Sequence, residues 1–395
     1  MDSNININYT KKPLPARFLT IAGGLTLIGI AIYVLAYLID YKRAAFNNTI
    51  GFMFIYSIGA GSLFLVALEY LIGAVWSTPF RRISEFLSAS LFLAPLLVIP
   101  LLLNMHDLFH WTHKADVASD ELLSGKVPYL NENFFIIRTV AAFVIMWLFY
   151  YFIAGKSQKQ DKTGDYGMTK KILPFSAIIM PFMAITLTYM AMDWMMSLEP
   201  HWFSTIFGVY YFAGTVLAAL AMLTLLALYT NENGLLPKGL GRDHYYNFGA
   251  LMFAFINFWA YIAFSQFMLI WYANLPEETF WFIDRMEGGW AVFSIGLVFI
   301  HFIVPYALLL SRPSKSDPKR LKIAAVWILF AHYYDLYFLI MPTYSHSELP
   351  LSWTEFLMPI LPVGLVMLAF ALFSRNKNFI PVSDPKLKRG MDFHL

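Results

Sequence analysis

Cysteine is absent from all 395 residues of this chain. Thiolates bind iron–sulfur clusters and anchor c-type haem, so the chain can hold neither group, and it forms no disulfide. Any redox centre of those kinds must belong to a partner.

Charged side chains are scarce too, at 13% of the residues, whereas 59% are hydrophobic and the mean hydropathy is +0.59. This composition lies outside the range of soluble globular proteins and leaves no room for an independent soluble domain. The sequence has no Gly-rich phosphate loop, nucleophile elbow, HExxH pair or basic aromatic stripe. Soluble-type catalysis and nucleic-acid binding therefore have no support.

Long apolar runs are what the sequence has in abundance. Each approaches or exceeds the roughly 20 residues that span a bilayer as a helix. They predict an all-α polytopic membrane protein with about ten transmembrane helices in a single integral membrane domain, 1–395. We interpret the first run as a retained helix, because no small-residue cleavage site follows it. The runs lie near 18–39, 50–76, 86–103, 134–154, 172–196, 203–229, 248–272, 289–310, 323–342 and 353–373.

A faint internal repeat divides these helices. Asp193 precedes Pro200 by seven residues, and Asp335 precedes Pro342 by the same distance. We therefore expect two four-helix bundles, 50–196 and 203–342, between a peripheral first helix and a tenth helix at 353–373. Chance is the alternative explanation of so short a match.

The basic residues predict the orientation. Most of the 28 Lys and Arg residues fall in the two tails and in alternate loops, and cytoplasmic loops retain such residues. Both termini are therefore expected in the cytoplasm.

Ionisable residues inside the apolar runs are the main functional signal, because they are costly in lipid and usually mark ion or proton routes. One set of candidates spans the depth of the membrane, and we predict a proton path through it. The alternative is that each residue closes an interhelical hydrogen bond or an ion pair of the Arg138–Asp193 type. The proton-path candidates are Asp193, Asp335, His332, His301, Glu69, Arg138 and Glu355.

His332 and Asp335 are three positions apart and so share a helix face. His301 falls at similar depth on the preceding antiparallel helix and could complete a triad. Such a triad can shuttle protons. Two histidines on neighbouring helices could instead bind a b-type haem, which we consider the weaker interpretation.

A second histidine group follows the third run. His106, His110 and His113 would share one face if that helix continued outward. Zinc binding is conceivable at this spacing, but a wet segment that contacts a partner is the better explanation, and we predict no metal site.

Two long motifs carry a family resemblance: DWMMSLEPHWFSTIFGVYYFAG from Asp193 to Gly214, and FSQFMLIWYANLPEET from Phe264 to Thr279. Both closely resemble the NrfD-like (polysulfide reductase membrane subunit) family, in the branch found in alternative complex III. That complex is a bacterial quinol:cytochrome c, or other acceptor, oxidoreductase, and the chain resembles the smaller of its two NrfD-like subunits. The length, the ten helices and the cytoplasmic termini agree with the family.

The resemblance implies a multi-pass subunit of the bacterial inner (cytoplasmic) membrane without a redox metal of its own. The implied partners are a paralogous NrfD-like subunit, a periplasmic iron–sulfur subunit, haem c subunits, lipids and a terminal oxidase. Haem and iron–sulfur centres would lie in those partners. The role it implies for this subunit is proton translocation, and a quinone such as menaquinone is the one cofactor that the chain itself could bind. Candidates to hold the quinol hydroxyl are Asp193, His201, Asp335 and Arg138.

Two other functions stay open. The chain could be a structural scaffold of such a complex without chemistry of its own. It could also be an independent proton-coupled transporter, although the sequence lacks the matched pairs of broken helices that mark a midplane substrate site.

Overall fold

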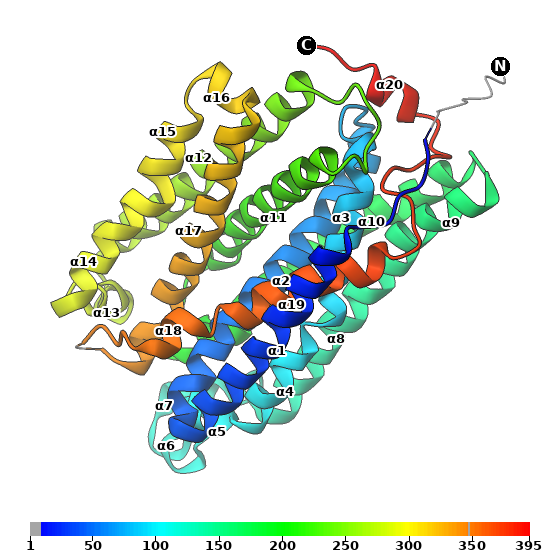
Figure 1. Ribbon diagram of the computed structural model, residues 1–395. Helices are drawn as coiled ribbons and strands as arrows, with labels where there is room; N and C mark the ends of the chain where they lie inside the picture. Colours follow the sequence, from blue (N-terminus) through cyan, green and yellow to red (C-terminus); the bar gives the residue numbers. More distant parts are fainter. Residues whose placement is uncertain (1–8, 347) are drawn as a thin grey trace.

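The computed structural model describes residues 9–346 and 348–395, and this part of the chain is mostly helical, without a strand. Ten helices are long and apolar enough to cross a membrane, which confirms the prediction of an all-α polytopic membrane protein. Figure 1 shows them as one tilted bundle, with the C-terminus and the first described residues at the same end.

The first five spans follow the predicted runs, and two of them are irregular. The third span is broken into short pieces, and the fourth passes through a π-helical turn. In order, the spans are α1 (Ala16–Ile39); α2 (Tyr41–Ile72); η1 (Thr78–Phe80) with α3 (Arg81–Ser88), η2 (Ala89–Phe92) and α4 (Pro95–Leu103); α8 (Glu132–Tyr150) with η4 (Tyr151–Gly155) and α9 (Lys156–Thr163); and α10 (Met168–Trp194) with η5 (Met196–Leu198).

The other five spans form the second half of the bundle. They are α11 (Phe207–Glu232); α12 (Arg242–Ala273); α14 (Gly288–Leu297) with π-helical η6 (Val298–Ile303) and α15 (Val304–Leu309); α17 (Pro318–Tyr344); and α18 (Trp353–Leu357) with α19 (Ile360–Ser374). Short helices occupy the connections: α5 (Met105–Leu108), η3 (His110–Thr112), α6 (Lys114–Ser119), α7 (Glu121–Lys126), α13 (Pro276–Asp284), α16 (Arg312–Ser316) and α20 (Leu387–Met391).

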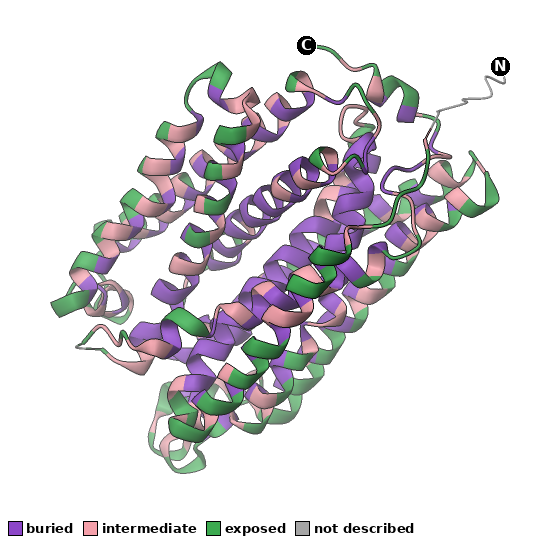
Figure 2. Cartoon of the chain, in the orientation of Figure 1, coloured by how far each residue is buried: buried purple, intermediate pink, exposed green. Residues whose placement is uncertain are grey.

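Two helices form the centre of the molecule. In α2 and α11, 89% of the most apolar stretch is buried by protein, compared with 28% in α1. Figure 2 shows both as nearly continuous buried ribbons. Around them, α10 and α17 pack against both, α12 packs against α11, and α1 packs against α19 at the edge.

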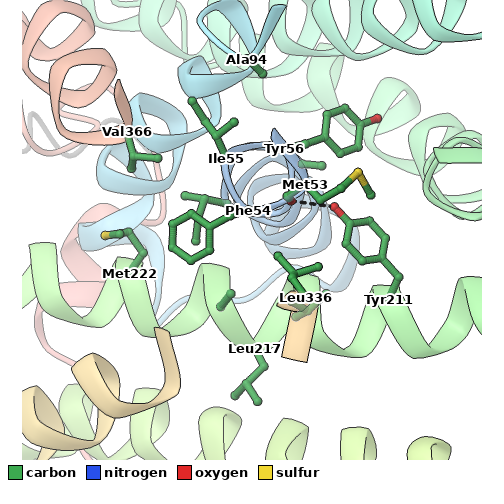
Figure 3. Close-up of a cluster of buried hydrophobic side chains, with 14 of the residues drawn as sticks. Met53, Phe54, Ile55, Tyr56, Ala94, Tyr211, Leu217, Met222, Leu336 and Val366 are labelled. Atoms are coloured by element: carbon green, nitrogen blue, oxygen red, sulfur yellow. Dashed lines mark hydrogen bonds between the residues drawn. The ribbon is translucent and has the colours of Figure 1, made fainter. Parts of the chain in front are cut away.

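Close contact between α2 and α11 depends on a small residue. A Cβ atom added at Gly61 would lie 2.6 Å from the Thr215 carbonyl oxygen of α11. Figure 3 shows the packing nearer the N-terminal end of α2, where the Tyr211 hydroxyl of α11 reaches α2 and donates to the Met53 carbonyl oxygen at 2.9 Å. Small residues are typical of helix contacts in membranes, where no hydrophobic force drives helices together.

Proline residues leave carbonyl groups free, and side chains from other helices bind them. Pro95 has no N–H for the Leu91 carbonyl, one turn earlier, and the indole of Trp147 in α8 donates to that oxygen at 3.0 Å. Free backbone groups need such partners inside a membrane domain. The Leu91 carbonyl of the broken third span is therefore hydrogen-bonded without water.

Candidate functional site

A cluster of titratable side chains lies at the contact of α2, α11, α12, η6 and α17. We call it the His–Asp cluster, and its core consists of His301, His332 and Asp335. One ligand atom of each lies within 4.8 Å of the others. All three residues are buried, with at most 2% of their surface exposed. The structure thus brings together the triad that the sequence analysis expected.

Local sequence explains how the three residues meet. His332 and Asp335 are one turn apart on α17, and His301 lies in the π-helical η6 just before Pro305. A π-helical turn shifts side-chain direction and is frequent at functional sites. Across from them Gly214 leaves room, since a Cβ atom there would lie 3.1 Å from His332 Nδ1.

Two aromatic side chains that the sequence analysis did not single out bind Asp335. The Tyr210 hydroxyl donates to Asp335 Oδ1 at 2.5 Å, and the Trp259 indole N–H donates to Oδ2 at 3.1 Å. Trp259 also stacks on His301 with ring centroids 3.7 Å apart. Tyr210 lies within the Asp193–Gly214 motif, which was the only signal that could have pointed to it.

Several polar atoms of the cluster have no partner. Ser57 Oγ of α2 lies 2.8 Å from His332 Nε2, which leaves His332 Nδ1 unpaired. Both ring nitrogens of His301 are also without a hydrogen bond in the described part of the chain. No Lys or Arg side chain forms a salt bridge with Asp335 among residues 9–346 and 348–395. The cluster therefore holds groups that can bind a proton but no fixed cation.

The steric arrangement does not suit a bis-histidine haem. Trp259 stacks directly on the His301 ring, and the two imidazoles are already close enough for a ligand atom of each to lie within 4.8 Å. A macrocycle between them would have to displace the indole and break its bond to Asp335.

Asp193 and Arg138 form a bidentate ion pair, the alternative that the sequence analysis offered. Arg138 donates through Nε to Oδ2 at 2.8 Å and through Nη2 to Oδ1 at 2.9 Å. The Tyr129 hydroxyl adds a third bond to Oδ1 at 2.9 Å. Both oxygens of this carboxylate are therefore hydrogen-bonded, and the carboxylate is paired with a cation.

Glu355 is held in a similar way at the start of α18. Arg43 donates to both of its oxygens at 2.8 Å, and Asn47 donates to Oε1 at 2.9 Å. The carboxylate also accepts from the Ser352 backbone N–H, which completes a capping box. Its position is thus explained by helix capping and ion pairing.

Glu69 belongs to a buried charge network at the opposite end of the bundle. Arg81 donates to Glu69 at 3.0 Å and to Asp384 of the C-terminal segment at 2.6 Å. The neighbouring Arg82 pairs with Glu85 and Asp161. Sequence analysis missed Asp384 and Asp161, because both lie outside the apolar runs.

His201 is hydrogen-bonded to Asp120 and not to Asp193. Its Nε2 lies 2.5 Å from Asp120 Oδ2 on the loop side of the bundle, and the hydrogen bond from His201 holds the pKa of Asp120 below its usual range. No described hydrogen bond or ion pair joins His201 to Asp193 or Arg138. The four residues expected to hold a quinol head therefore belong to three separate hydrogen-bonded groups, which are the Arg138–Asp193 pair, the His201–Asp120 pair and the His–Asp cluster.

The second histidine group does not lie on a continuous helix, so the condition for a shared helix face is not met. α4 ends at Leu103, and the chain turns through short pieces, with the Asn104 amide bound to the Pro100 carbonyl. His110 and His113 still approach Asp116, with ligand atoms within 4.8 Å, but all three side chains are about half exposed.

No family model matches the chain, and no curated protein matches it.

Proposed function

We propose that the chain is a proton-translocating subunit of a bacterial respiratory quinol:cytochrome c, or other acceptor, oxidoreductase in the inner membrane. The single observation that carries the proton-translocating role is the His–Asp cluster, a buried carboxyl group with two imidazoles and no paired cation. Buried polar groups of this kind in membrane helices are expensive and usually functional.

The proposed chemistry requires only side chains that bind and release protons. The Asp335 carboxyl and the His301 and His332 imidazoles can each bind and release one, and their ligand atoms within 4.8 Å allow transfer after a small rotation or through one water. Tyr210 and Ser57 extend the hydrogen-bonded chain on two sides. The other predicted path residues differ, because Asp193, Arg138, Glu69 and Glu355 would have to break charge-assisted bonds to take part. We therefore assign them to the ion pairs that hold the helices together and not to the path.

Membership of a redox complex rests on the family resemblance of the two long motifs. A chain without cysteine would depend on the paralogous NrfD-like subunit, the periplasmic iron–sulfur subunit and the haem c subunits for all electron transfer. A quinone at Arg138 and Asp193 stays part of this proposal.

Purification tests whether the chain belongs to a respiratory complex, and measurements in sealed vesicles test whether it moves protons. Mild-detergent extraction of the tagged chain should bring down c-type cytochromes, which are visible by their haem absorption, whereas an independent transporter would come out alone. In sealed vesicles, His301→Gln and His332→Gln complexes should keep quinol oxidation and lose most proton movement. Normal proton movement in both variants would favour the scaffold function.

A further inference from the structure

A pocket of about 600 Å³ opens beside the His–Asp cluster, between α11, α12, α13, α14, η6 and α17. This volume is in the range of roughly 300–1,000 Å³ typical of small-molecule sites. Its wall is mostly hydrocarbon and aromatic. Four lining side chains, Tyr261, Phe264, Met286 and Val298, are more than half exposed, so the mouth lies on the side of the bundle that would face lipid.

Arg285 forms part of the inner wall and is the unusual residue of the pocket. Its side chain is buried, with 2% exposed, and its guanidinium lies 3.5 Å above the ring of Trp281. Burial lowers the pKa of Arg285 to about 9. No carboxylate forms a salt bridge with it in the described ranges 9–346 and 348–395.

Backbone oxygens hold Arg285 in place. Nε donates to the Phe338 carbonyl and Nη2 to the Leu339 carbonyl, both at 3.1 Å, and Nη1 donates to the Trp281 carbonyl at 2.9 Å. The Phe338 oxygen is free because Pro342, one turn later in α17, has no N–H. A guanidinium has five N–H donors, so two are left for a ligand, and no carboxylate among the described residues lies within salt-bridge distance of it.

A second polar group faces the pocket. Gln266 of α12 is buried, and its Oε1 atom has no hydrogen-bond partner. Arg285 binds α17 six residues before that helix ends at Tyr344, which places it about 9 Å below the helix end. The pocket thus has a polar end near one membrane surface and an apolar body that continues toward the midplane.

We propose that this pocket binds one anionic phospholipid from the bilayer, with its phosphate against Arg285, a headgroup hydroxyl donating to Gln266 Oε1, and an acyl chain along α12 and η6. Charge complementarity decides the ligand class. Direct pairing stabilises a buried cation, and a neutral lipid or a quinone would fill the same space without a negative charge to pair with Arg285. Membrane proteins bind anionic lipid heads in basic pockets between helices.

A bound lipid would also affect the cluster. Tyr210 and Trp259 both line the pocket and donate hydrogen bonds to Asp335. An acyl chain in the pocket would cover these two side chains on the lipid side. This part rests on the proposed function, whereas the binding of lipid does not.

Native mass spectrometry of the purified protein, delipidated in detergent, tests the binding directly. The probes are phosphatidylglycerol and phosphatidylcholine with identical chains, and menaquinone. We expect one phosphatidylglycerol to bind with roughly fivefold preference over phosphatidylcholine, and Arg285→Gln to abolish that preference.

A second variant keeps the test valid if Arg285→Gln fails to fold. Ala263→Trp fills the pocket without changing Arg285 and should prevent retention of phosphatidylglycerol, whereas Ala141→Trp on the exposed face of α8 should not. Equal retention of both phospholipids, or unchanged retention in Ala263→Trp, would overturn the proposal. Menaquinone that displaces phosphatidylglycerol and binds Arg285→Gln equally well would also overturn it. Because none of these readouts measures proton movement, the lipid site and the proton path can fail separately.

Discussion

At the scale of single residues, the buried carboxylates divide into two groups. Asp193 and Glu355 each accept two bonds from an arginine, whereas Asp335 accepts only from Tyr210 and Trp259, both uncharged. The first arrangement fixes a charge in place. The second can gain or lose a proton without breaking an ion pair, which is why we centre the account on Asp335.

Tyr210→Phe tests the hydrogen bond to Asp335. The ring and its packing stay, but Asp335 Oδ1 loses its donor, so we expect a loss of stability of roughly 1–2 kcal/mol and clearly slower proton movement. Thermal unfolding in detergent and vesicle acidification measure the two effects. Tyr211→Phe is the matched control, because that hydroxyl binds the Met53 carbonyl and not Asp335. Equal slowing in both variants would contradict the role given to Tyr210.

Asp193→Asn tests the ion-pair interpretation. Removing one partner of a buried pair leaves Arg138 uncompensated, which costs roughly 3–5 kcal/mol. We expect a marked loss of assembly or of resistance to unfolding, measured by titration with a denaturing detergent. The double variant Arg138→Met with Asp193→Leu should recover much of the loss, since it removes both charges. A stable Asp193→Asn protein without proton movement would instead assign Asp193 to the path.

Sequence alone could predict part of this residue-level arrangement. The i, i+3 spacing of His332 and Asp335 fixes their common face, and the order of the helices brings His301 to the same depth. Ser57, Trp259 and Tyr210 could not be identified, because their contacts depend on how α2, α12 and α11 rotate against α17. For the same reason the sequence was equally compatible with an ion pair and with a proton path at Asp193. Only the distances between Asp193 and its partners distinguish these two interpretations.

At the scale of helices, the spans were predictable and their breaks were not. Apolar length alone gave ten spans, because a helix in lipid must satisfy its own backbone. The π-helical turns at η4 and η6 and the breaks before α4 leave the apolar pattern unchanged, so hydropathy does not detect them. Because α4 ends before the His106 group, these histidines do not share a helix face.

Gly61→Ala tests the contact of the two central helices. A Cβ atom 2.6 Å from the Thr215 carbonyl must push α2 and α11 apart, and overpacking of this kind typically costs about 1–3 kcal/mol. We expect lower thermal stability in detergent and a smaller yield of folded protein. Gly23→Ala in α1 is the control, because a Cβ atom there meets nothing within 4 Å. Equal stability of the two variants would show that α2 and α11 can separate without cost.

At the scale of the whole molecule, the C-terminal segment closes one end of the bundle through the Arg81–Asp384 pair. Burial alone would raise the pKa of Asp384, but the Arg81 charge and hydrogen bonds from Lys386 and Arg81 hold it below its usual range. A carboxyl group with a lowered pKa stabilises the fold above its unfolded value of about 3.9 and loses that contribution as pH falls through the lower folded value.

The docked segment should therefore be insensitive to pH between about 5 and 8 and should loosen only in stronger acid. Limited proteolysis of the last residues at several pH values measures this, and Asp384→Asn should be cleaved readily even at pH 7. Release of the segment in the unmodified protein near pH 6 would contradict the assignment, because Asp384 would then titrate well above its usual range.

The central claim is that protons move through Asp335. The most direct measurement is the number of protons moved per electron transferred, with quinol oxidation and vesicle acidification followed in the same sealed vesicles, for the unmodified complex and for Asp335→Asn. The account predicts nearly normal electron transfer and a large fall in protons per electron in the variant. An unchanged ratio in an intact Asp335→Asn complex would contradict the account and leave the subunit as a scaffold.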